Sequence, residues 1–138
     1  MKVHTTNYIN TFIEIAPDSP TDVGHVPNAR AGKTTVAQTA FEMISAHPYK
    51  YTSDDVLFEI FALKNELLPS EYVEARVNFF SKGQACLRAS PLTKRYGWGI
   101  HHDEHGKIAI YGAESPDYRK IVLDPEIKKV KAMKSSKS

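Results

Sequence analysis

The chain has 138 residues, of which 41% are hydrophobic and 25% are charged. This length suits one globular domain and is too short for two. No apolar run approaches the roughly 18 residues that a membrane-spanning helix needs, and the first residues lack the apolar block of a signal peptide, so we expect no membrane partner. The single cysteine, Cys86, cannot form an internal disulfide, which fits a cytoplasmic location.

The positive charge is concentrated at the C-terminus. The chain carries 18 basic and 16 acidic residues, and five of the lysines lie in the last eleven residues, which hold no acid. Without those five, residues 1–127 have 13 basic against 16 acidic residues, a net charge of −3. We therefore expect one domain over 1–127 and a lysine-rich, flexible tail over 128–138. Because nucleic-acid-binding domains concentrate positive charge on their folded surface, we do not expect a nucleic-acid partner.

The first third of the chain predicts a strand, a loop and a helix. Residues 7–15 are rich in β-branched and aromatic side chains, which predicts a strand. Residues 16–33 contain three prolines and two glycines, which indicates a long surface loop that either covers a site or is mobile. Apolar residues then recur at helical spacing as far as Pro48. This pattern predicts a helix over 34–46 with Thr34 as its N-cap.

The middle of the chain predicts a strand and a second helix. In residues 56–63 both alternating faces are apolar, as in a central strand, so we predict a strand there. The preceding Thr52-Ser53-Asp54-Asp55 would cap a helix equally well, and this alternative stays open. Pro69-Ser70-Glu71 begins a helix over about 70–82. We expect its apolar stripe to face the core; the stripe consists of Tyr72, Val73, Val77 and Phe80.

A β-hairpin is predicted over residues 97–111. Asp103-Glu104-His105-Gly106 reads as a four-residue loop with Gly106 at positive φ. A loop of that length places Trp98 opposite Tyr111. We expect the indole of Trp98 to be mostly buried against the helix of residues 70–82, through Tyr72, Val77 or Phe80.

The last predicted element is a helix over residues 116–123. Ser115-Pro116-Asp117 supplies an N-cap, a proline at the first helical position and a first-turn acid. Strands grouped in a hairpin, with helices between and after them, indicate a single-domain α+β fold with a mostly antiparallel sheet.

Three histidines cluster near the hairpin loop: His101, His102 and His105. Neighbouring side chains on a strand point to opposite faces, and a zinc site needs three or four convergent ligands. We therefore predict no metal site and no cofactor. The predicted register puts His101 on the face of Ile108 and Ile110 and leaves His102 and His105 in solvent. His101 is either a hydrogen-bonded core residue or a titrating group in a pocket.

Two further motifs have ordinary explanations. Ala31-Gly32-Lys33-Thr34-Thr35 resembles part of a phosphate-binding loop, but Pro27 stands where that motif needs its first glycine. A hinge glycine before a helix cap explains this segment more simply. Cys86 has no second cysteine beside it, so we expect a small buried side chain and not a nucleophile.

The segment with the most chemically functional side chains is residues 88–99. Guanidinium and ammonium groups bind carboxylate or phosphate, and tyrosine and tryptophan offer flat faces for a ring. The leading hypothesis is therefore a binding module for a small anionic ligand. Its candidate residues are Arg88, Lys94, Arg95, Tyr96 and Trp98. We expect Arg88 and Arg95 to converge on one concave surface near Trp98; the alternative is that Trp98 anchors the core while the cations are solvated.

Two other functions stay open. A small enzyme would use a carboxylate of Asp54 or Asp55 together with His101, with Tyr51 as a proton donor, and the two groups would have to share a pocket. A nucleic-acid or protein-interaction module would act through the lysine tail and the Lys94-Arg95 pair. The sequence does not define an oligomeric state.

Three stretches resemble the signature of a family of small bacterial proteins known only as a domain of unknown function. They are His4-Thr5-Thr6-Asn7-Tyr8, the run from Pro48 to Phe58 (PYKYTSDDVLF) and the run from Ser90 to His101 (SPLTKRYGWGIH). The resemblance spans nearly the whole chain. It implies a single-domain, cytoplasmic bacterial protein and supplies no activity, cofactor or catalytic residue.

Overall fold

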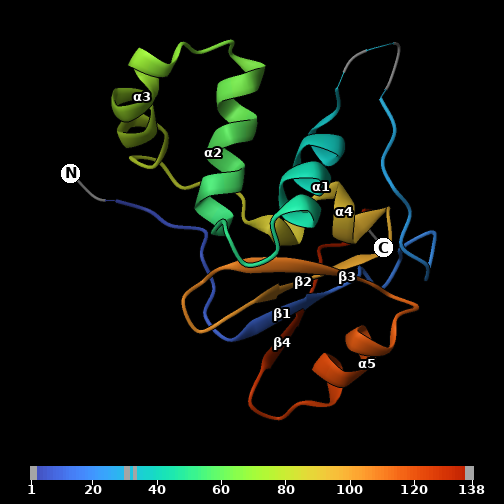
Figure 1. Ribbon diagram of the computed structural model, residues 1–138. Helices are drawn as coiled ribbons and strands as arrows, with labels where there is room; N and C mark the ends of the chain where they lie inside the picture. The colour runs from blue at the N-terminus through green and yellow to red at the C-terminus, as the bar shows by residue number, and fades with distance from the viewer. Residues whose placement is uncertain (1–2, 30–31, 33, 136–138) are drawn as a thin grey trace.

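The computed structural model describes residues 3–29, 32 and 34–135, and it confirms the α+β fold. Four strands form one sheet in the order β3-β2-β1-β4 (Figure 1). Strand β1 runs antiparallel to β2 and parallel to β4, and β2 runs antiparallel to β3. The strands are β1 (Thr11–Glu14), β2 (Trp98–His102), β3 (Ile108–Gly112) and β4 (Lys128–Lys131).

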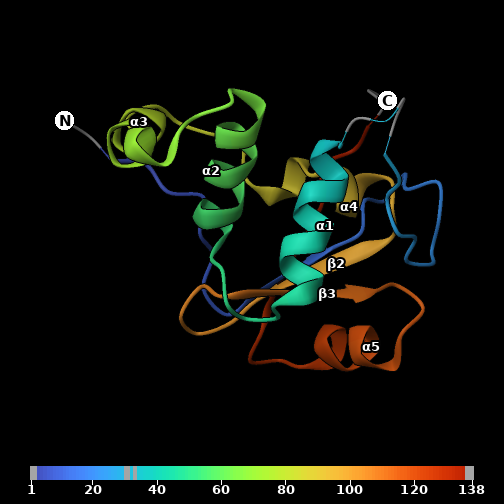
Figure 2. The ribbon, with the colours of Figure 1, turned by 45° about the horizontal axis from the view of Figure 1, so that its top comes forward.

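Helices cover both faces of the sheet unequally. Helix α5 lies on one face of the sheet and α1 lies on the opposite face, as Figure 2 shows. In the described residues, α5 covers Pro116–Leu123, α1 covers Val36–Ala46, α2 covers Ser53–Lys64, α3 covers Tyr72–Phe79 and α4 covers Pro91–Lys94. Helices α1, α2 and α4 contribute to the core opposite α5, and α3 packs on α2. Two 3-10 turns, Pro69–Glu71 and Leu87–Ala89, precede α3 and α4. In the described part of the chain, no helix is long and apolar enough to cross a bilayer.

The hydrophobic core has two parts. The larger part fills the space between the sheet and helices α1, α2 and α4, and includes Ile13, Ile44, Val56, Leu92 and Ile100. The smaller part joins α2 to α3 through Phe58, Ala62 and Phe80. Helix α3 thus packs on α2 and stands apart from the sheet (Figure 1).

Residues 56–63 form most of helix α2, so the predicted strand is wrong and the open alternative is right. Thr52 caps this helix: its Oγ1 accepts the N–H of Asp55, and the Asp55 carboxylate accepts the N–H of Thr52. Both sides of α2 are apolar because one side packs on the main core and the other on α3. Burial on two sides removes the amphipathic pattern that distinguishes a helix from a central strand.

Helix α3 is shorter than predicted and presents a different face to the core. Phe80 is buried, and Tyr72 packs against the α2–α3 cluster. Val73 is 81% exposed and Val77 is 56% exposed, so the expected stripe is wrong at these two positions. An eight-residue helix that packs on a single neighbour buries only a narrow strip of its surface.

The hairpin forms, but its register differs from the prediction by one residue. Asp103 and Lys107 pair through the N–H of Asp103, and Gly106 has φ +76°, so the loop has three residues and not four. Trp98 consequently lies opposite Gly112 and not Tyr111. A slip of one residue exchanges the two faces of a strand. His102 therefore points into the main core and is 0% exposed, where we expected it in solvent.

His101 points to the other face of the sheet. It pairs with Ala109 on β3 and with Phe12 on β1, and the Phe12 ring meets Tyr118 of α5 edge-on at 4.9 Å between centroids. The prediction that His101 shares a face with Ile108 and Ile110 is therefore wrong.

The lysine-rich segment begins as a strand and not as a flexible tail. Strand β4 pairs with β1, and Ala132, just beyond it, is 3% exposed. The Lys129 ammonium donates to the carbonyl oxygens of Asp124 and Ile127. Lysines suit an edge strand because charge discourages pairing with another chain. The domain therefore extends past residue 127, and Lys137 lies outside the described residues.

Three element boundaries at the start of the chain also differ from the sequence prediction. Strand β1 covers only four of the nine predicted residues, because Asn10 has φ +48° and interrupts extended backbone. Helix α1 is capped by Thr35, whose side chain accepts the N–H of Gln38, and not by Thr34. Of the segment that resembles a phosphate-binding loop, Ala31 and Lys33 lie outside the described residues.

Candidate functional site

A cleft of about 530 Å³ opens between α2 and α3. Its walls come from α1, the turn before α2, and the facing sides of α2 and α3. Its polar and aromatic lining includes Lys50, Tyr51, Asp55, Glu59, Tyr72 and Arg76. Pockets of this volume are typical of small-molecule sites. The sequence had singled out two of these residues, Tyr51 and Asp55, but as parts of a proposed enzyme.

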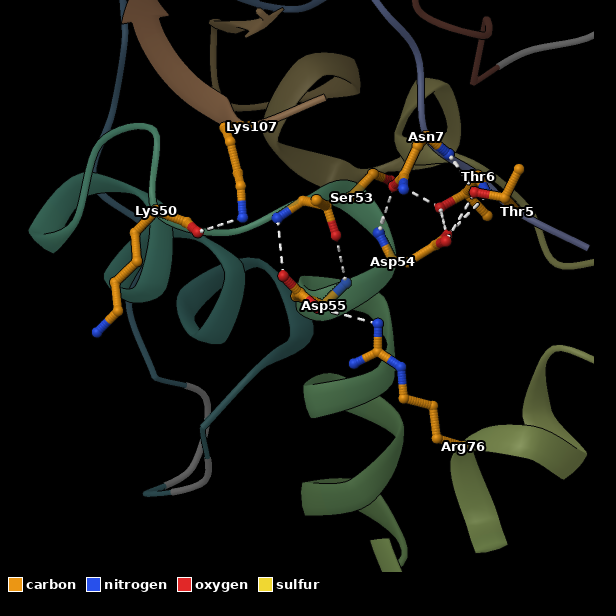
Figure 3. A network of polar contacts seen from close by, with 10 residues as sticks. Thr5, Thr6, Asn7, Lys50, Ser53, Asp54, Asp55, Arg76 and Lys107 are labelled. Atoms are coloured by element: carbon orange, nitrogen blue, oxygen red, sulfur yellow. Dashed lines mark hydrogen bonds and ion pairs between the residues drawn. The ribbon is translucent and has the colours of Figure 1, made fainter. Parts of the chain in front are cut away.

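The Asp55–Arg76 ion pair joins the two helices within this cleft. The Arg76 Nη2 donates to Oδ1 of Asp55 at 2.9 Å (Figure 3). The other carboxylate oxygen, Oδ2, accepts the N–H of Thr52 as part of the helix cap. Burial alone would raise the pKa of Asp55, but the N–H of Thr52 and the Arg76 guanidinium outweigh it and hold that pKa below its ordinary value. Asp55 is therefore ionised at neutral pH and orients Arg76.

Two aromatic rings also hold the Arg76 guanidinium. Its central carbon lies 5.7 Å from the ring centroid of Phe58 and 5.5 Å from that of Phe80. Its side chain remains 42% exposed. Among the described residues, only Asp55 accepts a hydrogen bond from this guanidinium. Arg76 is thus fixed in position with donors still available to a ligand.

The cleft contains two further charges of opposite sign. The ammonium of Lys50 lies 5.3 Å from the ring centroid of Tyr51. Within the described residues, neither Lys50 nor Glu59 forms an ion pair. Both side chains line the same cleft, one from the turn before α2 and the other from α2 itself.

Asp54 points away from the cleft and fastens the N-terminal segment to α2. Its carboxylate accepts the hydroxyls of Thr5 and Thr6 and the N–H of Thr6, each at 2.7 Å (Figure 3). Its own N–H donates to Oδ1 of Asn7 at 2.9 Å. The first two of the three stretches noted in the sequence therefore meet here, and their contact is structural.

Replacing Asp54 with alanine should release residues 4–8. Several hydrogen bonds to a charged acceptor are lost, so we expect the free energy of unfolding to fall by about 1–3 kcal/mol. Hydrogen exchange of the amides at residues 4–8 should accelerate more than exchange in β2. Asp22→Ala, which removes an exposed loop carboxylate, is the control. Unchanged exchange at residues 4–8 in Asp54→Ala would contradict this role.

The structure does not form the expected carboxylate–histidine pair. The Nδ1 of His101 is hydrogen-bonded to the Tyr49 hydroxyl at 2.8 Å, and that hydroxyl is bonded to the hydroxyl of Tyr111 at 2.7 Å. Burial lowers the pKa of His101, against the opposing influence of nearby acids. The Asp54 carboxylate accepts from Thr5 and Thr6, and the Asp55 carboxylate accepts from Thr52 and Arg76. His101 thus belongs to a tyrosine network and not to the cleft.

His102 is a fully buried core residue. Neither of its ring nitrogens forms a hydrogen bond within the described residues, and its ring meets Tyr8 edge-on at 5.3 Å between centroids. Burial lowers its pKa to about 4, although backbone groups of Thr11 and Ile100 oppose the shift. His102 is therefore neutral at pH 7.

Arg88 and Trp98, two of the residues named for the anionic ligand, have different neighbours in the structure. The Arg88 Nε donates to the carbonyl oxygen of Lys131 at 2.7 Å, at the end of β4. A small cavity of about 180 Å³ does adjoin Trp98. It is lined by residues such as Ile44, Pro48 and Tyr111, and by none of Arg88, Lys94, Arg95 and Tyr96. The converging pair of arginines is therefore not found at this cavity.

Trp98 is half-buried under different neighbours from those expected. Its ring lies 5.3 Å from that of Phe41 on α1, and its Nε1 donates to the carbonyl oxygen of His25 at 2.7 Å. The segment that contains Gly24 and His25 therefore covers Trp98. This close approach requires glycine at position 97, because a Cβ there would lie 2.2 Å from the carbonyl oxygen of Val23.

Cys86 and the histidine cluster supply no metal site in the part of the chain that the structure describes. No group of three or more His, Cys, Asp or Glu side chains there could hold an ion. The thiol of Cys86 is free and lies 3.4 Å from the Tyr8 hydroxyl.

The sequence analysis did not identify Lys50, Glu59 and Arg76 as site residues. Glu59 follows Asp55 by one helical turn, so a helix assignment for residues 53–64 would have placed both acids on one face. Arg76 then becomes the nearest candidate cation on the next helix. Lys50 carries no sequence signal beyond its position beside two tyrosines.

The sequence comparisons give a family and no relatives of known function. A family model described as "Family of unknown function (DUF6157)" matches residues 3–138. The chain therefore belongs to this family. The search of curated proteins and the search of solved structures found no match.

Proposed function

We propose that this member of the DUF6157 family binds a small ligand with a carboxylate or phosphate group in the α2–α3 cleft. The observation that carries the proposal is Arg76, a cation held by Asp55 and two rings while part of its guanidinium faces open space. An arginine whose position is fixed before binding loses little conformational freedom when an anion arrives. Lys50 provides a second positive charge in the same cleft.

The walls of the cleft indicate that the ligand also has an apolar body. Tyr51, Phe58 and Tyr72 present aromatic surface beside the charged groups. Aromatic walls with a few placed polar groups are the usual composition of a ligand site. A bacterial origin and a cytoplasmic location are part of the same proposal and rest on the resemblance and the single cysteine.

Binding should be measured with 3-phenylpropionate and phenyl phosphate, using 3-phenylpropionamide as the uncharged comparison. We expect both anions to raise the melting temperature, because a ligand that binds the native state stabilises it. Calorimetry should give dissociation constants weakened about tenfold or more by Arg76→Met, the cost of losing a charge-assisted hydrogen bond.

Arg76→Met also removes the ion pair with Asp55, so a second variant is needed. Lys50→Met changes an exposed side chain without an ion pair in the described residues and should weaken both anions several-fold. Arg95→Met, which changes an exposed arginine outside the cleft, should bind like the parent protein. Equal binding of the amide and the anions, or full affinity in Lys50→Met and Arg76→Met, would refute the proposal.

A further inference from the structure

The charges of the cleft favour a particular class of ligand within the proposed function. Asp55 and Arg76 compensate each other through their ion pair. The two remaining charges are the cation Lys50 and the anion Glu59, and neither has a charged partner among the described residues. The free charges of the site are therefore one of each sign.

A purely anionic ligand fits this arrangement poorly. Its negative group would bind at Arg76 but would also approach the carboxylates of Asp55 and Glu59, which repel it. The helical rise places Asp55 and Glu59 about 6 Å apart along α2. Glu59 is thus about one helical turn from the Asp55–Arg76 pair, where it can meet a second group of the same small molecule.

An ammonium group on the ligand would remove this conflict. It would pair with the Glu59 carboxylate and lie against the aromatic walls, whose ring faces attract cations. Tyr51 already has the ammonium of Lys50 near its ring, and Tyr72 lines the same space. An acid and an amine a few ångströms apart on an apolar body describe an amino acid with an apolar side chain.

We infer that the ligand of the α2–α3 cleft is a zwitterion of the amino-acid type, whose acidic group binds Arg76 and whose ammonium binds Glu59. This inference rests on the proposed function and adds a role for Glu59. It also assigns the aromatic rings to the apolar side chain of the ligand.

The test compares four probes that share one ring: L-phenylalanine, 3-phenylpropionate, phenethylamine and N-acetyl-L-phenylalanine. Calorimetry should show phenylalanine binding about tenfold more tightly than each single-charge probe, as expected for one added charge-assisted contact. The N-acetyl compound retains the carboxylate and loses the ammonium, so it should bind no better than 3-phenylpropionate.

The Glu59→Gln variant separates the inference from the proposed function. The substitution preserves shape, so we expect a folded protein that loses its preference for phenylalanine and binds 3-phenylpropionate at least as well as the parent. Glu74→Gln, an exposed acid of α3 outside the cleft, should retain the preference. Equal affinity for phenylalanine and 3-phenylpropionate, or a preference that survives Glu59→Gln, would overturn the inference while leaving the proposed function intact. Failure of all four probes to bind would overturn both.

Discussion

The free energy of unfolding should fall by about 3 kcal/mol as the pH is lowered from 6.5 to about 4, because His102 cannot readily be protonated in the fold. Its side chain is 0% exposed, and burial lowers its pKa from 6.5 to about 4. In the unfolded chain the imidazole takes up a proton near pH 6.5, whereas in the folded chain it does so only near pH 4. Over this interval the unfolded state binds more protons, so acid favours unfolding.

The measurement is urea denaturation at a series of pH values between 4 and 7.5. His102→Leu, which is similar in volume and does not titrate, should remove most of the pH dependence in this interval. His101 has a lowered pKa as well and contributes with the same sign, so a smaller slope should remain. Most of the stabilisation from Asp55 is lost below its ordinary pKa of 3.8, so it affects only the acid end of the interval.

The control for this prediction is His105→Asn, which removes an exposed histidine of the hairpin loop. It should retain the loss of stability in acid that His102→Leu removes. Parent and His102→Leu curves with the same slope between pH 6.5 and 4 would show that His102 is hydrated or paired in solution, and the prediction would fail.

Local sequence signals predicted much of the fold. The cap and proline at Ser115-Pro116 place α5 as expected, and the hairpin strands lie within one residue of their predicted positions. These features depend on residues close together in the chain. Helix α2 was assigned wrongly because its pattern reflects packing on two sides, and packing depends on residues far away in the sequence.

The exchange of roles between His101 and His102 shows how a small local error changes a functional prediction. The Asp103 side chain accepts the N–H groups of His105 and Lys107, which closes a three-residue loop. That one-residue difference in loop length sends His102 into the core and His101 towards α5. Sequence periodicity alone does not distinguish a three-residue loop from a four-residue loop, and only the pairing of the strands fixes the register.

The candidate site was predicted only in part, because its residues come from segments that are separate in the sequence. The dense run of cations and aromatics over residues 88–99 drew attention because its members are adjacent in sequence. In the fold, Arg88 lies at the end of β4, and Trp98 lies beneath the segment that contains His25. The cleft instead gathers Lys50, Glu59 and Arg76 from three segments. A single sequence contains no pattern that predicts that α2 and α3 face each other.

The C-terminal lysines were predicted as a flexible tail for the same reason: the contacts that make them a strand are long-range. Charge density suggested a solvated tail, since the segment contains a single branched apolar residue, Val130, before Ala132. Parallel pairing with β1 and burial of Ala132 are long-range contacts. A charged edge strand and a flexible basic tail have similar compositions, and only the pairing partner separates them.

Trp98 of β2 joins the sheet to α1 and to the segment of residues 21–25. The indole packs on Phe41, bonds to His25 and lies against Gly24, where an added Cβ would be 3.0 Å from the ring. The N–H of Gly24 in turn donates to the Glu114 carboxylate, and the N–H of His25 donates to the Tyr96 carbonyl oxygen. The segment that contains Gly24 and His25 is thus held by hydrogen bonds as well as by the indole.

Trp98→Ala should therefore lower the free energy of unfolding by about 3 kcal/mol, toward the lower end for large aromatic truncations because the side chain is only half-buried. For a domain of this size such a loss lowers the melting temperature by about 10 °C or more. Hydrogen exchange at residues 21–25 should accelerate, since the loop loses its main apolar contact and one hydrogen bond. Trp98→Phe keeps the ring against Phe41 and loses only the bond to His25, so it should cost about 1 kcal/mol. If Trp98→Ala instead melts like the parent protein, the indole contributes little to the core, and its role would have to be contact with a ligand at the adjoining cavity.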